Sequence, residues 1–240
     1  MRKNILCAAF IAAASFMSCN FGGETIDGNG NRKSEIRHVG NTKKINAVGG
    51  MDVFVDAGAP AIKVEGDENI LPYIETKVNG DWLEIKTRDH VNIHSSNPIK
   101  VYVTTPDISD LKVNGSGNIT CNNKFSSSNN MSFSITGSGN ITANVNSPAV
   151  NAGITGSGNM YIKGETRNAD IHITGSGNYD SPDLKAENAS VKISGSGDAN
   201  LFADVNLEAS IAGSGDIKYR GKAAVHKNIA GSGSVVKVQE

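Results

Sequence analysis

The triplet Gly-Ser-Gly occurs seven times between residues 115 and 233 of this 240-residue chain, and its regular spacing constrains the fold more than any other feature. Successive triplets start 22, 19, 19, 20, 18 and 18 residues apart, at Gly115, Gly137, Gly156, Gly175, Gly195, Gly213 and Gly231. Such a period is typical of proteins in which one structural unit stacks on the next, because so short a unit cannot bury its own apolar face.

Apolar and polar residues alternate through each repeat, and the alternation continues through the glycines. In the first repeat the polar residues share one parity, and the other parity holds Leu111, Val113, Gly115, Gly117, Ile119 and Cys121. Strict alternation indicates β-strands with one buried face. Ile and Val together number 41 against 7 Leu, which also favours strands over helices.

These patterns predict an all-β protein, a single-chain parallel β-solenoid similar to a right-handed β-helix, with seven Gly-Ser-Gly repeats of 18–22 residues and a β-rich N-terminal cap. An antiparallel meander is the alternative. The triplet itself is either a tight turn that uses Gly for a positive φ, or a strand bend whose inward positions have no room for a Cβ. The dihedral angles of the glycines distinguish the two.

We expect residues 35–240 to form one domain, in which a β-rich part at 35–110 caps the repeat solenoid at 111–240. In the first part, Asn79-Gly80 lies between two apolar runs and predicts a β-hairpin. Residues 67–73 predict a single helical turn.

Residues 1–18 are predicted to be a signal peptide. Arg2 and Lys3 give it a positive start, and the apolar stretch at 5–16 is too short to span a bilayer but suits a signal-peptide core.

The signal peptide is followed by a cysteine, and Phe16-Met17-Ser18-Cys19 resembles a bacterial lipobox. Cys19 is therefore the predicted lipidation site, and the Gly-rich residues 19–34 are the predicted flexible lipoprotein tether. An ordinary secretory signal that is cleaved elsewhere is the alternative. Cys121 then remains alone at an apolar strand position, where we expect a buried, inert thiol.

Three stretches together resemble a known family: residues 64–74 (VEGDENILPYI), residues 101–106 (VYVTTP) and the repeated Gly-Ser-Gly-Asn/Asp. The chain is similar there to the family described as putative auto-transporter adhesin, head GIN domain, which is common among lipoproteins of Bacteroidetes. The resemblance spans roughly residues 40–238. It implies a β-helix-like fold and a location in the cell envelope, and it implies no catalytic residues.

Several kinds of chemistry have no matching motif. The triplets lack the third Gly of a dinucleotide fingerprint, and no catalytic triad signature is visible. We expect no enzyme activity, no cofactor and no metal. The net charge of −1, without a Lys/Arg run, argues against nucleic-acid binding. Asp198 and Asp216 occupy equivalent positions one repeat apart, so they either share a cation or are simply solvated.

The outward parity predicts columns of hydroxyl and amide side chains along the stack, and these form the candidate binding surface. The columns comprise Ser116, Asn118, Thr136, Ser138, Asn140, Thr155, Ser157, Asn159, Thr174, Ser176, Asn178, Asp198 and Asp216. They contact a glycan or a surface protein, or they only solvate the coil and hydrogen-bond along it. Aromatic residues that could add sugar-stacking surfaces, or instead cover the core, are Tyr161, Tyr179, Tyr219 and Phe202.

The sequence therefore predicts a non-enzymatic envelope lipoprotein that presents a repetitive polar β-surface for adhesion or binding. The alternatives are a carbohydrate-active enzyme on a β-helix scaffold and a structural or assembly component of the envelope. We expect a lipid-anchored protein of the outer membrane, on either its periplasmic face or the cell surface.

Overall fold

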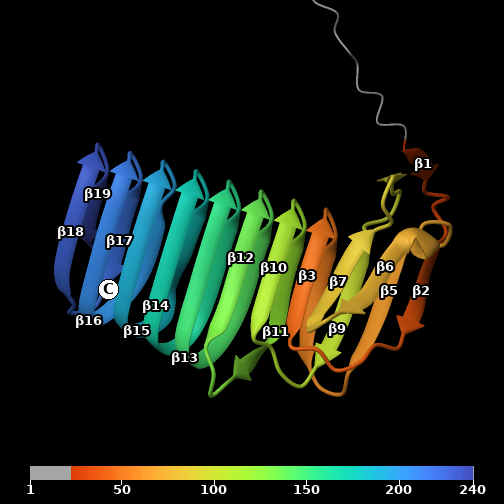
Figure 1. Ribbon diagram of the computed structural model, residues 1–240, viewed down its shortest axis with the longest axis horizontal. Coiled ribbons are helices and arrows are strands. Elements are labelled where there is room, and N and C mark those ends of the chain that lie inside the picture. Colours follow the sequence, from red (N-terminus) through yellow and green to blue (C-terminus); the bar gives the residue numbers. More distant parts are fainter. Residues whose placement is uncertain (1–22, 240) are drawn as a thin grey trace, which may run out of the picture.

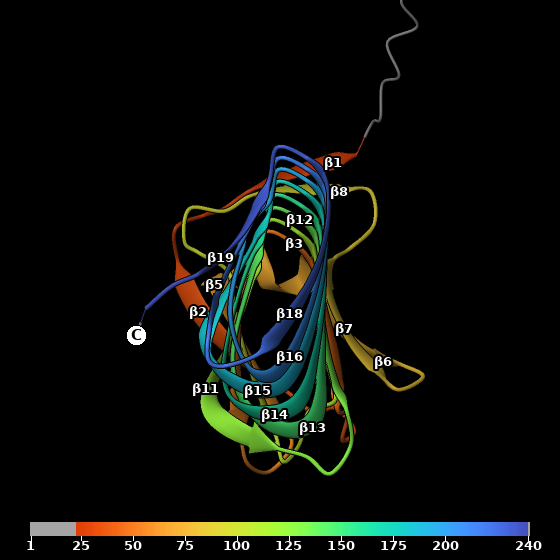
Figure 2. The same ribbon diagram turned by 90° about the vertical axis from the view of Figure 1, so that its left-hand side faces the viewer.

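A computed structural model describes residues 23–239, which form a parallel β-solenoid (Figure 1). Successive coils lie side by side along the long axis, with the N-terminal strands at one end and the C-terminal strands at the other. Figure 2, which looks along the solenoid from its C-terminal end, shows the coils superimposed as a flattened ring. The predicted all-β solenoid is confirmed, and the antiparallel meander is wrong for the repeats because their strands pair in parallel.

The strands of the N-terminal part are β1 (Glu24–Asp27), β2 (Arg32–Arg37), β3 (Lys44–Gly49), β4 (Asp52–Ala57), β5 (Ala61–Asp67), β6 (Ile74–Asn79), β7 (Trp82–Thr87), β8 (Val91–His94) and β9 (Lys100–Thr105). The strands of the repeats are β10 (Asp110–Gly115), β11 (Asn118–Ser126), β12 (Met131–Gly137), β13 (Asn140–Gly156), β14 (Asn159–Gly175), β15 (Asn178–Gly195), β16 (Ala199–Gly213), β17 (Asp216–Arg220), β18 (Ala224–Gly231) and β19 (Ser234–Lys237). The one helical segment among the described residues is a 3-10 turn, η1 (Leu71–Tyr73), as predicted.

The repeats stack in register, so that each residue lies over its equivalent in the neighbouring coil. Ile154 of β13 pairs with Ile135 of β12 on one side and with Ile173 of β14 on the other. The resulting aliphatic column is 1% exposed at each member, namely Val113, Ile135, Ile154, Ile173, Ile193 and Ile211. Stacking like on like fills the thin interior with β-branched side chains, which pack well on a pleated surface.

The Gly-Ser-Gly triplet forms one corner of the coil, and the structure combines the two alternatives that the sequence left open. The first glycine has a positive φ, for example 119° at Gly156, which turns the chain out of its strand. The second glycine has an ordinary φ but lies against the coil below. A Cβ on Gly158 would be 2.4 Å from the carbonyl oxygen of Gly139. The first glycine is needed both for its dihedral angle and for its lack of a side chain, since a Cβ on Gly156 would also lie 2.4 Å from the oxygen of Gly137, and the second glycine is needed for its lack of a side chain.

The N-terminal part continues the same stack. Strand β3 pairs in parallel with β10, which places Gly49 beside Gly115, and β4 pairs in parallel with β11. Below them, β7 and β9 pair in parallel with β3 and β4. Antiparallel strands then close this end: β5 pairs with β9 and with β2, and β6 forms the predicted hairpin with β7, which projects to one side in Figure 2.

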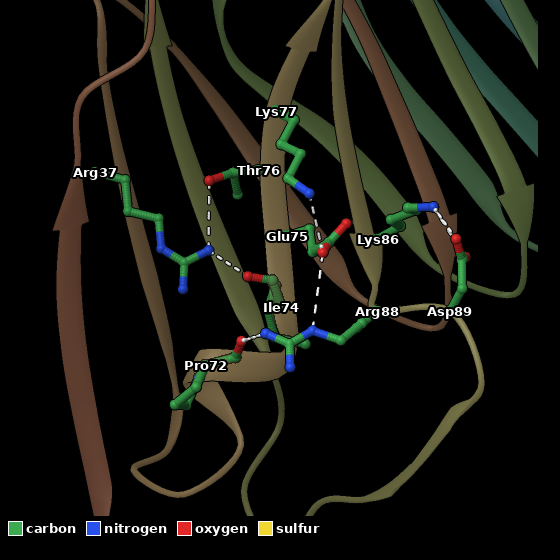
Figure 3. Close-up of polar contacts among 9 residues, drawn as sticks. All are labelled: Arg37, Pro72, Ile74, Glu75, Thr76, Lys77, Lys86, Arg88 and Asp89. Atoms are coloured by element: carbon green, nitrogen blue, oxygen red, sulfur yellow. Dashed lines mark hydrogen bonds and ion pairs between the residues drawn. The ribbon is translucent and has the colours of Figure 1, made fainter. Parts of the chain in front are cut away.

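Two arginines fasten the strands of this N-terminal end to one another (Figure 3). Arg37 of β2 donates hydrogen bonds to the carbonyl oxygens of Ile74, at 2.5 Å, and Leu71, at 2.8 Å. Arg88, which follows β7, donates to the carbonyl oxygen of Pro72 at 3.0 Å. Charge-assisted bonds satisfy the carbonyls of η1 and of the start of β6, and so hold this turn between β2 and β7.

A fully buried carboxylate, Asp67, holds the loop after β8 in place. Asp67 accepts hydrogen bonds from the backbone N–H of Ser96 at 2.7 Å and from the amide of Asn97 at 2.5 Å. Burial alone raises the pKa of Asp67, but the bonds from Asn97, Ser96 and Ser95 outweigh it and hold the pKa below its ordinary value. A Cβ on Gly28 would be 2.0 Å from the Asp67 carboxylate, so the segment after β1 also packs against this group.

One expectation needs correction at the N-terminal side. The predicted flexible tether at 19–34 includes β1, which pairs in parallel with β8, and the start of β2, which pairs with β5. Short polar strands with two glycines between them resemble a linker in composition, but their pairing partners lie 67 residues away in β8 and 25–35 residues away in β5. The signal peptide at 1–18 and Cys19 lie outside the described residues.

Candidate functional site

Three polar columns follow the Gly-Ser-Gly corner along the solenoid. Thr136, Thr155 and Thr174 pair with one another at the ends of β12, β13 and β14, and all three side chains are exposed. The serines lie at the bend itself, where their backbone N–H groups donate to the first glycine of the coil below. That of Ser157 lies 2.9 Å from the oxygen of Gly137. The sequence correctly placed both columns on the outward face.

The third column is a hydrogen-bonded ladder of amides. The Nδ2 atom of Asn118 donates to Oδ1 of Asp52 at 2.7 Å, and each later asparagine donates in the same way to the one before it. The distances are 2.7 Å for Asn140, 2.9 Å for Asn159 and 3.0 Å for Asn178. These side chains therefore hydrogen-bond along the stack. Since an amide has two N–H groups and an oxygen with two lone pairs, each inner member keeps one donor and one acceptor for another partner.

Where aspartate replaces asparagine in the ladder, a backbone N–H takes the place of the side-chain amide as the donor. Oδ1 of Asp198 accepts the backbone N–H of Asp216 at 2.8 Å, and Oδ1 of Asp216 accepts both the N–H and the hydroxyl of Ser234 at 2.8 Å. Each carboxylate thus has one oxygen engaged in the stack. Within residues 23–239 no group of three or more His, Cys, Asp or Glu could hold a metal ion, so a cation between these two aspartates would lack further acidic or imidazole ligands.

The four aromatic residues singled out by the sequence differ in exposure. Tyr179 lies in the core, where burial raises the pKa of its hydroxyl above the ordinary value. Tyr219 packs against the core, and Phe202 lies under Lys185, whose Nζ is 4.2 Å from the ring centroid. Tyr161 is the most exposed of the four, at 42%. The expectation that aromatic residues fill or cover the core therefore holds for Tyr179 and Tyr219.

A shallow trough lies beside the amide ladder, on the outward face of β4, β11, β13 and β14. Its volume is about 540 Å³, and its lining residues are Asp52, Val53, Phe54, Asn118, Ile119, Thr120, Asn140, Thr142, Asn159 and Tyr161. Phe54, Thr120 and Thr142 were not among the predicted binding residues. The alternating parity marks each of them as outward, but only the pairing of β4 with β11 brings Phe54 next to Thr120.

A second hollow of about 520 Å³ lies at the opposite corner of the coil. Its charged residues are of both signs: Glu165, Arg167, Lys185, Glu187 and Asp204. The corner is built by buried hydroxyls that donate to backbone carbonyls two residues on, from Ser147 to Ala149 at 3.0 Å and from Thr166 to Asn168 at 3.1 Å. These hydroxyls close the coil as turn-forming residues do, so they serve the fold.

The free cysteine and the two histidine–aspartate pairs of the described residues differ in burial. Cys121 is buried, and burial raises the pKa of its thiol to about 12, so the reactive thiolate is suppressed. His94 lies 3.2 Å from Asp27 and His172 lies 3.1 Å from Asp170, and both pairs are well exposed on the surface. Within residues 23–239 no helix is long and apolar enough to cross a bilayer.

Comparison with solved structures identifies proteins of similar fold from Parabacteroides and Bacteroides. A crystal structure described as a "putative lipid binding protein" from Parabacteroides distasonis ATCC 8503 is 28% identical, with a TM-score of 0.74, over 90% of this chain and 100% of that one. A "putative adhesin" from the same strain is 25% identical, with a TM-score of 0.73 and the same coverage of both chains.

A "putative adhesin" from Bacteroides fragilis NCTC 9343 has the higher TM-score of 0.82 over 89% of this chain and 100% of that one, although only 20% of residues are identical, so it supports the fold alone. No curated protein matches the chain. The profile of the family described as "Putative auto-transporter adhesin, head GIN domain" matches residues 41–223, which cover most of the N-terminal strands and nearly all of the repeats. The chain therefore belongs to the putative auto-transporter adhesin, head GIN domain family.

Proposed function

We propose that this protein is an exported, lipid-anchored adhesion module of the outer membrane that binds its target through the outward polar face of the solenoid and catalyses no reaction. Its membership of an adhesin family supports the adhesive role at a coarse level. The observation that carries the proposal is the set of aligned columns along the Gly-Ser-Gly corner. Identical groups recur there at one per coil, which presents a regular surface to a repetitive partner.

The flatness and order of this surface suit binding better than they suit chemistry. The amide ladder holds its side chains in one conformation, so a partner that contacts it need not immobilise them, which lowers the entropic cost of binding. Catalysis in turn usually needs a concave site with groups of shifted pKa, and the thiol of Cys121 is held protonated.

The adhesive role is tested by placing a charge on each face in turn. Thr155→Lys and Ser157→Lys alter two of the columns, whereas Asn146→Lys adds the same charge at the opposite corner, where Asn146 is also exposed. We expect binding of labelled protein to host or bacterial surfaces, measured by flow cytometry, to fall for the column variants and to persist for Asn146→Lys. Unchanged binding for every face would refute the proposal, and release of sugars from polysaccharide would favour the enzyme alternative.

The anchor is tested separately. We expect metabolic labelling with an alkyne-bearing fatty acid to mark the wild-type protein and to fail for Cys19→Ser, which should appear in the soluble fraction. Protease treatment of intact cells then distinguishes a cell-surface orientation, in which the protein is digested, from a periplasmic one, in which it is protected. Labelling of Cys19→Ser at the wild-type level would exclude this anchor.

A further inference from the structure

We propose that the trough between Phe54 and Tyr161 is a binding site for a neutral, extended glycan chain that runs parallel to the solenoid axis. The proposal deepens the adhesive function proposed above and rests on it, because it names one site on the polar face and the chemical class of its ligand. It is supported by the register of four strands, the aromatic ends of the trough, its free hydrogen-bonding groups and its charge.

The trough is a straight row of side chains, one from each of four successive coils. Phe54 of β4 pairs with Thr120 of β11, Thr120 pairs with Thr142 of β13, and Thr142 pairs with Tyr161 of β14. Neighbouring strands are ~4.8 Å apart, so three steps place the two rings about 14 Å from each other. The two threonine hydroxyls lie between the rings. This arrangement has the length and direction of a short linear ligand laid across the strands.

The aromatic ends offer the surfaces on which sugars commonly stack. The ring of Phe54 is stacked on Tyr102, with centroids 5.3 Å apart and an angle of 21° between the planes, and Lys63 lies 4.2 Å from the centroid of Tyr102. Phe54 is thus held in place before any ligand binds. Tyr161 at the other end is 42% exposed. Rigid aromatic side chains supply a large contact area at a low cost in conformational entropy.

Along one side of the row the amide ladder supplies unused hydrogen-bonding groups. Asn118, Asn140 and Asn159 each spend one N–H on the asparagine or aspartate below and one oxygen lone pair on the asparagine above. Each retains a second N–H and a second lone pair. Together with the hydroxyls of Thr120 and Thr142, they present both donors and acceptors once per coil, which matches a chain of hydroxyl groups rather than a ligand with only one kind of group.

The charge of the trough favours a neutral ligand. Asp52 is the one charged residue in its lining, and its carboxylate already accepts from Asn118. Lys100, the register partner of Asp52 on β9, has its Nζ 6.0 Å from the centroid of the Phe54 ring, so this end of the trough has one charge of each sign. A chain of uronic acids or sulfated sugars would meet no cluster of Lys or Arg here, and such clusters are how proteins hold repeated anions.

The position of the trough argues against a peptide strand as the occupant. A peptide that adds to a sheet uses the unpaired backbone groups of an edge strand. The strands under the trough lie inside the sheet, where β11 pairs with β4 on one side and β13 on the other, and β13 pairs further with β14. Their backbone groups are consumed, so only side chains are offered, and flat polar side-chain surfaces suit hydroxylated ligands.

The test measures binding of the protein to neutral oligosaccharides by isothermal titration calorimetry, with cellohexaose and N-acetylglucosamine hexamer as probes and oligogalacturonate as the anionic comparison. We expect at least one neutral probe to bind, and Tyr161→Ala to weaken its Kd about tenfold, the effect of losing one aromatic contact. Tyr161→Phe should retain most of the affinity, because it keeps the ring. Thr142→Lys should abolish binding by filling the trough.

The matched control is Asn146→Lys, which adds the same charge to an exposed residue at the opposite corner, outside the trough lining, and should leave the Kd unchanged. Circular dichroism verifies that each variant is folded. The proposal is overturned if neither neutral probe binds, if only the anionic probe binds, or if Thr142→Lys and Asn146→Lys behave alike. If surface binding persists in Thr142→Lys and is lost in Thr155→Lys, the trough is wrong and the adhesive function stands. Glycan binding by a protein that attaches to no cell surface would instead support the trough and refute the adhesive function.

Discussion

The second glycine of each triplet allows a sharp test of how the coils pack, and Gly158 is the best position for it. A methyl group at this position would lie 2.4 Å from the oxygen of Gly139 and 2.6 Å from Cγ2 of Ile135. Moving the oxygen to an acceptable contact of about 3.2 Å requires a local separation of about 0.8 Å, because a closely packed interior has no spare volume. We therefore expect Gly158→Ala to force the two coils apart.

The cost follows from what this separation breaks. The N–H of Asn159 donates to the same oxygen of Gly139 at 3.2 Å, and a shift of about 0.8 Å takes the pair beyond hydrogen-bond range. Losing that bond costs about 1 kcal/mol, and overpacking against Ile135 adds about 1–3 kcal/mol. Gly158→Ala should therefore lower the free energy of unfolding by about 2–4 kcal/mol.

Gly153, on β13 shortly before the same triplet, provides the matched control. A Cβ there has nothing within 4 Å, and its φ is ordinary, so Gly153→Ala should be neutral or stabilise the protein by up to about 1 kcal/mol through the unfolded chain. Urea denaturation followed by far-ultraviolet circular dichroism measures both variants. Equal denaturation midpoints for Gly158→Ala and Gly153→Ala would refute the packing argument.

Three further predictions concern other parts of the molecule. Asp67 has a folded pKa below its ordinary value, so its contribution to stability is complete above about pH 4 and is lost as the pH falls through the folded pKa. Asp67→Asn should therefore reduce the fall in melting temperature at acid pH, and the same fall as in the wild type would contradict this prediction. In the last coil, Lys227 and Lys237 occupy the register positions of Ala209 and Tyr219, which pack in or against the core one coil earlier. A charged side chain at such a position discourages another strand from pairing with the exposed edge of the sheet. Replacing both by Val should therefore produce concentration-dependent oligomers in light scattering, and a monomer at all concentrations would argue against this role. Cys121 should resist iodoacetamide at pH 8 until the protein unfolds, since its pKa is about 12; rapid labelling of the folded protein would contradict the burial argument.

The N-terminal part shows where reading the sequence alone reaches its limit. Its hairpin and its 3-10 turn follow from local signals, since Asn-Gly between apolar runs and a proline after a polar segment bias the backbone within a few residues. The strands β1 and β2 carry no comparable signal. They are polar and short, and they exist because β8 and β5 offer them backbone partners.

For the candidate site too, some features could be predicted from the sequence and others depend on how the coils stack. The outward direction of Thr155 or Asn159 follows from parity alone, because side chains alternate across a strand. Whether Asn159 is free or bonded depends on the distance to Asn140 in the next coil, which is 2.9 Å between the two amides. The trough was missed for a related reason: Phe54 belongs to a segment separated from the repeats by the excursion at 58–109, and only strand pairing brings it beside Thr120.

By itself, the sequence determined the repeat length, the inward and outward faces and the need for two glycines per coil. These follow from short-range periodicity, since a strand has a period of two and each coil repeats the same solution. The tertiary structure alone decided why each glycine is required, which asparagines bond to one another, which aromatic residue is left exposed, and which segments become strands at the cap. Those outcomes depend on contacts between residues that are distant in the chain, and such contacts exist only once the coils have stacked.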